Sequence, residues 1–409
     1  MTRIVSVVVV SRDRPRLLLR TLLGLSQLDH TAFEVVLVAD AAGRAAIDAS
    51  PFAGRVKLAA FDQANISAAR NLGIAQAAGE VIAFIDDDSV PEPTWLSRLT
   101  APFDAAEVSA ATGYVRGRNG ISFQSRCARV DALGWDHPVP MPGDAVQVLD
   151  TRPGDAVKTV GTNCAFRSDV LRRHGGFDPA IRFFLDETEL DLRLAWTGAR
   201  IAVVPGAEVH HGFAASGRRT AARRPTTLHE EAASVAILLR KHAPEADMAA
   251  QFRLRRQAQE RRLARHLVQG TAEPRHYSDV LTSFDAGWAD GMARPLHSLA
   301  PLPEPQAGFL RFKTAPGETR VLAGRPGNVA RLRQEAERHV AEGGRASLFL
   351  FGRTGLYHRV RFTHAGVWEQ SGGQFGRSDR NMPIFQAVTY DRRLTAEIAR
   401  LSARNLPEY

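Results

Sequence analysis

Short apolar runs alternate with amphipathic segments over the first 85 residues of the chain. After the first run, Leu18, Leu22 and Leu25 recur at helical spacing behind Pro15, a residue that the first helical turn tolerates. A second helix is predicted over 67–78. Strands that alternate with helices in this way predict a mostly parallel sheet covered on both faces, an α/β fold. The four runs with the length and β-branched content of buried strands are 4–10, 34–38, 57–61 and 81–85.

The last of these runs ends in three consecutive carboxylates, Asp86, Asp87 and Asp88. In open α/β sheets ligands lie at the carboxyl ends of the strands, so these acids are expected on the rim of a ligand crevice. Adjacent carboxylates repel one another unless a cation joins them, and their oxygens suit Mg2+ or Mn2+. The alternative is a loop of solvated acids that stops at Pro91. The surrounding pattern favours the metal site.

A second acidic group opens a helix predicted over 187–196. Carboxylates are favoured in the first turns of a helix because they complement the positive end of its dipole. For Glu189 and Asp191 we therefore expect helix capping and surface charge, whereas Asp186 and Glu187 are candidates for chemistry.

Composition describes a globular protein that is large enough for two domains. The chain has 409 residues, of which 44% are hydrophobic, and no apolar run approaches the roughly 20 residues that span a bilayer. The first ten residues form a predicted strand instead of a signal peptide, so a cytoplasmic location is expected. Cys127 and Cys164 are too few for a disulfide framework and are predicted to be reduced thiols.

The net charge of +9 is distributed unevenly. Residues 1–212 are slightly acidic, and all of the basic excess lies after them. This asymmetry predicts an acidic partner for the C-terminal half: an anionic membrane surface, an acidic glycan or another protein. Nucleic acid is not expected, because the arginine-rich helix predicted over 251–266 lacks interleaved aromatic residues.

Four segments together resemble the family-2 glycosyltransferases of GT-A fold. The first strand with its polar turn, EVVLVAD at 34–40, NISAARNLG at 65–73 and FIDDDSVPEPTWL at 84–96 match the nucleotide-binding half in order and spacing. Residues 160–213 resemble the acceptor-side half. The resemblance implies a GT-A catalytic domain over 1–215, a mostly parallel sheet flanked by helices.

The resemblance also assigns roles in a nucleotide site. Asp40 takes the place of the acid that binds the base, the Arg70-Asn71 segment supports the nucleotide, and either Asp86 or Asp87 lies near the ribose. The chain departs from the family at two turns, with Val-Ser-Arg-Asp for Pro-Thr-Tyr-Asn and Ala-Asp-Ala-Ala for Asp-Asp-Gly-Ser. The nucleotide-binding set is Ser11, Asp40, Arg70, Asn71, Asp86 and Asp87.

The same resemblance implies a metal and a general base. Asp88 is the family's metal-binding acid, and His211 is the histidine expected at the metal or the diphosphate, with Mn2+ or Mg2+ as the ion. Neighbours in a strand face opposite sides, so His210 and His211 cannot both face the site. The family's Glu-Asp pair is reversed here as Asp186-Glu187; register favours Glu187 as the base, and Asp186 is the alternative.

An inverting, metal-dependent sugar transferase is the predicted function. The donor is a nucleotide-diphosphate sugar, with UDP expected and GDP or dTDP as alternatives, and the acceptor is a glycan or a lipid-linked intermediate in cell-surface polysaccharide synthesis. The Gln-x-x-Arg-Trp signature of processive synthases is absent from the sequence. A nucleotidyltransferase would need a glycine-rich loop where this chain has Ser-Arg-Asp-Arg-Pro. The other alternative is an inactive scaffold that binds a nucleotide sugar or a glycan.

The rest of the chain is divided into a basic, mostly helical linker region over 216–300 and a small α/β accessory domain over 301–409. Within the first, 216–224 is expected to be either a lid over the donor or a solvated linker. Within the second, 368–380 has the Gly, Gln and Arg content of a binding loop. The irregular segment 123–150 is expected to form acceptor-facing loops.

Overall fold

Four parallel strands begin the main sheet of the computed structural model, which describes residues 3–314 and 317–405. Each strand begins and ends within two residues of its prediction. β1 lies between β2 and β4, with Val5 opposite both Phe33 and Val81, and β3 extends the sheet beyond β2. The carboxyl ends of these strands therefore share one edge of the sheet. The strands are β1 (Val5–Ser11), β2 (Phe33–Ala39), β3 (Lys57–Ala60) and β4 (Val81–Phe84).

Beyond β4 the sheet becomes mixed. β12 (Cys164–Arg167) runs antiparallel between β4 and β6 (Val108–Arg116), and β13 (Arg200–His211) is parallel to β6. Three further strands pair antiparallel at this end. The parallel sheet that the sequence predicts thus holds for the N-terminal half of a ten-stranded sheet. The three further strands are β5 (Ser89–Pro91), β7 (Phe123–Ser125) and β10 (Gln147–Asp150).

Helices and buried side chains cover both faces of this sheet, as predicted. Val7 and Val9 of β1 belong to one hydrophobic cluster, and Val8 belongs to the cluster on the opposite face. A strand with both faces buried explains the continuous valine run. The helices of this unit are α1 (Pro15–Leu25), α2 (Ala41–Asp48), α3 (Ile66–Gln76), α4 (Trp95–Thr100), the 3-10 turn Ala101–Asp104, α5 (Ser168–Arg173) and α6 (Asp186–Ala195).

The segment 123–150 is more ordered than its composition indicates. It contributes β7 and β10 to the main sheet. A separate three-stranded antiparallel sheet has the order β11-β8-β9, formed by β8 (Ala128–Asp131), β9 (Asp136–Pro138) and β11 (Asp155–Val157).

Three helices follow the main sheet: α7 (His229–His242), α8 (Met248–Val268) and α9 (Pro274–Ala293). The arginine-rich helix predicted over 251–266 lies within α8. The three helices share one hydrophobic cluster with α6 and the three-stranded sheet. The cluster includes Leu192 of α6 and Leu239 of α7, so it anchors α7 to the unit that contains the main sheet. No helix within the described residues is long and apolar enough to cross a membrane.

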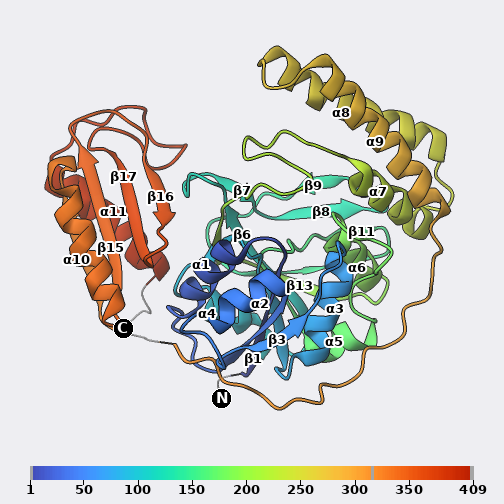
Figure 1. Cartoon of the computed structure of the whole chain (residues 1–409), viewed down its shortest axis with the longest axis horizontal. Helices are drawn as coiled ribbons and strands as arrows, with labels where there is room; N and C mark the ends of the chain where they lie inside the picture. Colours follow the sequence, from blue (N-terminus) through green and yellow to red (C-terminus); the bar gives the residue numbers. More distant parts are fainter. Residues whose placement is uncertain (1–2, 315–316, 406–409) are drawn as a thin grey trace.

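A four-stranded sheet of order β14-β15-β17-β16 forms the C-terminal domain, at one side of the molecule in Figure 1. Residues 368–373, predicted as part of a binding loop, instead belong to β17, which pairs with both β15 and β16; only residues from Gln374 onward leave the sheet. Val367 and Trp368 are both buried and belong to two different hydrophobic clusters, so apolar packing stabilises this strand. The elements are β14 (Thr319–Gly324), the 3-10 turn Pro326–Asn328, α10 (Val329–Ala341), β15 (Arg345–Gly352), β16 (Arg359–Phe362), β17 (Val367–Gly373) and α11 (Tyr390–Asn405).

Candidate functional site

A cavity of about 730 Å³ opens at the carboxyl ends of the parallel strands. The turn after β1, the acids after β4 and residues 215–219 form its walls, so the arginine-bearing segment predicted as a lid or a linker borders the site. The cavity brings together five residues that the sequence singled out: Ser11, Asp86, Asp87, Asp88 and His211.

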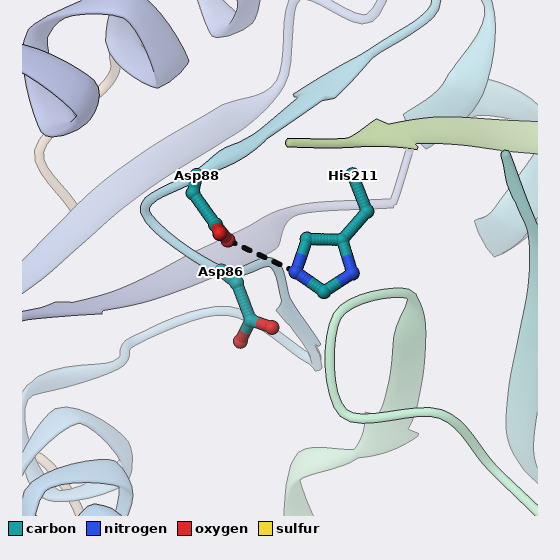
Figure 2. Close-up of side chains that lie close together, drawn as sticks. All are labelled: Asp86, Asp88 and His211. Atoms are coloured by element: carbon teal, nitrogen blue, oxygen red, sulfur yellow. Dashed lines mark ion pairs between the residues drawn. The ribbon is translucent and has the colours of Figure 1, made fainter. Parts of the chain in front are cut away.

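Asp86, Asp88 and His211 converge on one point of this cavity, as Figure 2 shows. Each offers one ligand atom, and these atoms all lie within 4.8 Å of one another. The His211 Nε2 atom lies 3.1 Å from the Asp88 Oδ1 atom. Strand pairing brings these side chains close together, because β5 follows the acids directly and Ser89 of β5 pairs with His211 of β13. Two carboxylates and one imidazole suit Mn2+ or Mg2+ as a ligand set.

Gln124 orients the ring of His211. The Nδ1 atom of His211 lies 2.8 Å from Gln124 Oε1, and an amide oxygen can only accept a hydrogen bond. The ring therefore carries a proton on Nδ1 and directs Nε2 toward the acids. A carbonyl that holds the distal nitrogen of a histidine is a common support of metal ligation. No sequence signal distinguished Gln124, since it lies on the short strand β7 in the irregular segment.

Asp88 is held as a carboxylate although it is buried. Burial by itself raises the pKa of this group, but the contacts with His211, the backbone N–H of Ala214 and the guanidinium of Arg14 lower it well below its usual range. The Ala214 N–H donates to Asp88 Oδ2 over 2.7 Å. A permanently ionised oxygen therefore faces the cavity.

Asp87 lies in a different environment beside Asp88. Its carboxylate accepts hydrogen bonds from Ser11 Oγ at 2.7 Å and from Arg14 Nη1 at 2.9 Å. Burial raises the pKa of Asp87 to about 7, against the charge of Arg14. Asp87 and Ser11 thus support each other at the wall, and Arg14, which sequence reasoning passed over, neutralises the acids.

Arg70 joins the two acidic groups of the site. Its guanidinium donates to Asp186 and to the carbonyl of Gly161 at 3.0 Å, and lies 3.5 Å from Asp86. It is buried and packs against the rings of Phe84 and Phe177, at 5.7 Å and 5.2 Å from their centroids. A buried cation between carboxylates fixes their positions.

Asp186 and Glu187 open helix α6 behind Arg70. The chain enters the helix through Phe184 and Leu185 in the left-handed region, with φ of 66° and 65°, a strained approach of the kind found at functional sites. Burial raises the pKa of Asp186 to about 8, against the pull of Arg70. Although burial opposes it, Arg70 and a hydrogen bond from Asp186 lower the pKa of Glu187. The two carboxyls are therefore coupled, and their burial beside Arg70 favours a single proton on the pair.

Besides Arg70, two further residues assigned to the nucleotide, Asn71 and Asp40, lie outside the cavity lining. Asn71 donates to the Phe177 carbonyl at 2.7 Å and accepts from the Phe177 N–H at 2.8 Å, so its amide holds a backbone turn. Asp40 caps α2 by accepting from the Gly43 N–H, and its other oxygen accepts from the Asp13 N–H, both at 2.8 Å. In this structure both side chains are engaged in shaping the backbone around the site.

Several cationic and aromatic residues line the cavity that no motif indicated. Arg218 lies 4.3 Å from the ring centroid of Phe183, and both face the cavity. Their separation in sequence hides them from motif reasoning, because 182–183 precede α6 and 218–219 follow β13. The cationic lining residues are Arg12, Arg14, Arg182, Arg218 and Arg219, together with His211 if protonated.

His210 faces away from this cavity, as the alternation of a strand requires. Its Nε2 atom lies 3.0 Å from Glu92 Oε1, and its ring packs 4.8 Å from the Trp368 ring of the C-terminal domain. Of the two adjacent histidines, only His211 reaches the candidate metal position.

Comparison with known proteins places most of this chain in one family. A family model described as "Glycosyltransferase like family 2" matches residues 2–242. The O-antigen biosynthesis protein RfbC of Myxococcus xanthus is 30% identical over 229 residues, 53% of this chain and 18% of the relative. The pre-mycofactocin glycosyltransferase of Mycobacterium tuberculosis is 28% identical over 163 residues, 39% of this chain and 32% of the relative. The chain thus spans less than a third of either relative.

Solved structures show more distant similarity. A crystal structure of GalNAc-T7 with UDP, GalNAc and Mn2+ aligns with a TM-score of 0.44 and 16% identity, over 58% of this chain and 48% of the other. The mannosyltransferase PcManGT of Pyrobaculum calidifontis, in complex with GDP-Man and Mn2+, aligns with a TM-score of 0.42 and 17% identity, over 72% and 88%. Because the family model matches more than half of its 409 residues, this chain belongs to the glycosyltransferase-like family 2, as the sequence resemblance predicted.

Proposed function

We propose that this protein is a metal-dependent, inverting glycosyltransferase that moves a sugar from a nucleotide-diphosphate donor, with UDP as the nucleotide, to a hydroxyl of a glycan or lipid-linked acceptor. The observation that carries the proposal is the meeting of Asp86, Asp88 and His211 in the wall of a large cavity, with a second carboxylate pair connected to them through Arg70. Family membership supports sugar transfer as the reaction class.

The three converging side chains fit a divalent ion. Asp88 is ionised, and His211 directs Nε2 toward it while Gln124 engages Nδ1. An ion held there would offset the charge that develops on the leaving diphosphate. Arg12, Arg218 and Arg219 of the chain itself line the same cavity and complement the phosphate oxygens.

Glu187 is the proposed general base. Arg70 and a hydrogen bond from Asp186 lower its pKa against the effect of burial, and Asp186 itself is bonded to Arg70. In the reaction the acceptor hydroxyl loses its proton to Glu187, its oxygen bonds to the anomeric carbon, and the bond from that carbon to the diphosphate oxygen breaks. A single displacement inverts the anomeric centre.

Asp40 and Asn71 do not fix where the nucleotide binds in this proposal. Both were assigned to the nucleotide by resemblance, and both hold backbone turns in this structure. Phe61, Gln63 and Ile66 line the end of the cavity near β3 and offer flat and polar surfaces for a base. We therefore assign the nucleobase to that end of the cavity. Asp40 supports this position indirectly, because it accepts the Asp13 N–H and so holds the turn after β1.

Contact with an anionic membrane remains part of the proposed setting. Among the residues of α8 only Arg255 and Leu263 are buried, which leaves most of its arginines on the surface, and α8 and α9 extend away from the main sheet in Figure 1. Exposed arginines attract anionic headgroups. Sedimentation with phosphatidylglycerol vesicles tests this contact, and no more pelleting than with phosphatidylcholine vesicles would remove it.

The proposed function is tested by thermal unfolding of the full chain with UDP, GDP, dTDP and CDP, each with and without Mn2+. A ligand that binds the folded state raises the melting temperature. We expect UDP to do so only when Mn2+ is present. If no nucleotide stabilises the protein under either condition, the chain is a scaffold and not a transferase of this type.

A further inference from the structure

Two adjoining cavities lie between the main sheet and the C-terminal domain. Their volumes are about 410 Å³ and about 420 Å³, and they share Ile121, Ser122, Asp379 and Arg380 as lining residues. One wall is the hairpin of β6 and β7, and the other is the segment that follows β17. The Arg380 Nε atom donates to Ser122 Oγ over 3.1 Å across this boundary. The cleft therefore exists only where the two domains meet.

Positive charge predominates in this cleft. Arg126, Arg377 and Arg380 line it, against one carboxylate, Asp379, whose Oδ1 accepts the Asn381 N–H. Within residues 3–314 and 317–401, none of the three guanidiniums lies within ion-pair distance of an acidic side chain, whereas Arg333 of the same domain, for example, pairs with Glu369. Unpaired guanidiniums around a cavity suit carboxylate or phosphate oxygens, which they bind in bidentate fashion.

Aromatic rings support two of these arginines. The guanidinium of Arg126 lies 4.5 Å from the ring centroid of Phe123, and that of Arg377 lies 4.3 Å from the ring centroid of Tyr357. Tyr357 is 54% exposed. Stacking holds the guanidinium planes in place, and an exposed ring beside them offers an apolar face to a flat ligand. Fixed cations next to aromatic faces fit a chain of sugars that carries negative groups.

One lining residue connects the cleft to the candidate metal centre. Gln124 faces the cleft and also contacts His211 Nδ1 at 2.8 Å. A ligand in the cleft would thus lie one side chain away from the group proposed to hold the donor diphosphate. The cleft is thus connected to the candidate metal centre and is not part of an unrelated surface.

We propose that this interdomain cleft binds an anionic glycan, carrying phosphate or carboxylate groups, as the acceptor of the transfer. The assignment of this ligand as the acceptor rests on the proposed function, but its binding does not. The C-terminal domain then has a role: it supplies Arg377, Arg380 and Tyr357, one half of the acceptor site.

Titration calorimetry of the full chain in excess EDTA tests binding without involving the metal. The probes are trigalacturonic acid, a glycerol-phosphate trimer and the neutral maltotriose. The variants are Arg126→Gln and Arg380→Gln, with Arg320→Gln as the matched control, because Arg320 is exposed on β14, the strand at the opposite edge of the sheet from β16. UDP with Mn2+ is titrated into every variant separately to confirm that the donor site is intact.

At least one anionic trimer is expected to bind the wild type at least about 10-fold more tightly than maltotriose does. Each cleft variant should bind that trimer at least about 10-fold more weakly than the wild type, because a charge-assisted contact is removed. Arg320→Gln should bind as the wild type does. Equal binding of anionic and neutral trimers, no binding of any trimer, or an equal loss in Arg320→Gln would overturn the proposal. Failure of the donor site would appear separately, as absent UDP binding in all proteins. Carboxylate and phosphate as the anion are distinguished by which trimer binds.

Discussion

A single buried arginine determines how the acids of this site divide their roles. Arg70 contacts both Asp86 and Asp186, so it lowers the repulsion within the metal-facing group and within the base-facing group at once. Because Asp186 makes the direct contact with Arg70, we propose the longer Glu187 as the carboxylate that takes the acceptor proton. The reversed order of the pair is therefore compatible with catalysis.

Glu187→Gln should lower the rate of sugar transfer by roughly 10²-fold or more, because the amide cannot take the acceptor proton. The affinity for UDP in the presence of Mn2+ should stay unchanged, since Glu187 is not among the residues that line the donor cavity. Initial rates and calorimetry measure the two quantities. Glu245→Gln, a change on an exposed loop, is the matched control. An unchanged rate of sugar transfer in Glu187→Gln would mean that Asp186 is the general base.

The sequence identified candidate residues that lie in recognisable motifs. It did not identify residues that only the folded chain brings to the site. Asp88 and His211 were singled out because Asp88 belongs to the acids that follow β4 and His211 ends β13, and ligands gather at strand ends in such sheets. Gln124 was missed, since its proximity to the site depends on loop paths that local sequence does not encode. Asn71 and Asp40 show the reverse: the motif was recognised, but hydrogen bonding to the backbone occupies their side chains.

At the scale of elements, the contact between α6 and α7 depends on a buried ion pair. Glu189 was predicted to cap a helix or lie on the surface, yet it is fully buried. Its carboxylate lies 2.8 Å from Arg193 Nη2 and 2.5 Å from Lys241 Nζ, and Lys241 reaches Asp178 as well. The prediction of surface charge was wrong because α7, which covers this face of α6, comes forty residues later in the chain.

Glu189→Gln should lower the free energy of unfolding by about 3 kcal/mol near neutral pH, because buried cations lose their partner. Although burial opposes it, the charges of Arg193 and Lys241 hold the folded-state pKa of Glu189 below its ordinary value of 4.5. The stabilisation by the ionised form is thus present above about pH 4.5 and is lost as pH falls below it.

Chemical denaturation near neutral pH and near pH 4 checks this dependence. The difference between wild type and Glu189→Gln should shrink at the lower pH. A difference that is equal at both pH values would show that the carboxylate charge is not what stabilises the helix pair. Glu245→Gln should show no difference at either pH.

The order of the helices and strands was largely predictable from the sequence. The pairing of strands beyond the first half of the main sheet was not. Periodicity placed β1 to β4, α1 and α3 closely, since each has a continuous apolar pattern. α2 was missed because Ala41–Asp48 is short and mostly alanine, and its start depends on the cap by Asp40. β17 was mistaken for a loop because its second half is rich in polar and glycine residues.

At the scale of the whole molecule, the C-terminal domain packs against the main sheet through a mixed cluster. Val90 and Ile121 of the catalytic half join Val360, Phe362 and Trp368 of the C-terminal domain. Backbone contacts reinforce the packing, since the Val360 N–H donates to the carbonyl of Asn119 at 2.9 Å. No pattern in the sequence reveals this contact, because both sets of residues look like ordinary core positions of their own domains.

Trp368→Ala should weaken the contact between the domains by about 3 kcal/mol, the lower end of the cost for removing a buried tryptophan. Hydrogen exchange of the Val360 amide should become faster, because local opening then requires less free energy. Trp196→Ala is the matched control, since Trp196 is 67% exposed on the catalytic half. Unchanged exchange at Val360 in Trp368→Ala would mean that the cluster does not hold the domains together.

The most direct test of the account is calorimetric titration of UDP into the wild type and Asp88→Asn, each with and without Mn2+. The account predicts that the wild type binds UDP only with Mn2+ and that Asp88→Asn loses more than about 100-fold, more than the loss of a supporting residue costs a metal site. Asp48→Asn, a change at the exposed end of α2, should bind as the wild type does. If Asp88→Asn binds UDP with Mn2+ as tightly as the wild type, then Asp88 does not hold the metal, and the proposed centre of Asp86, Asp88 and His211 is wrong.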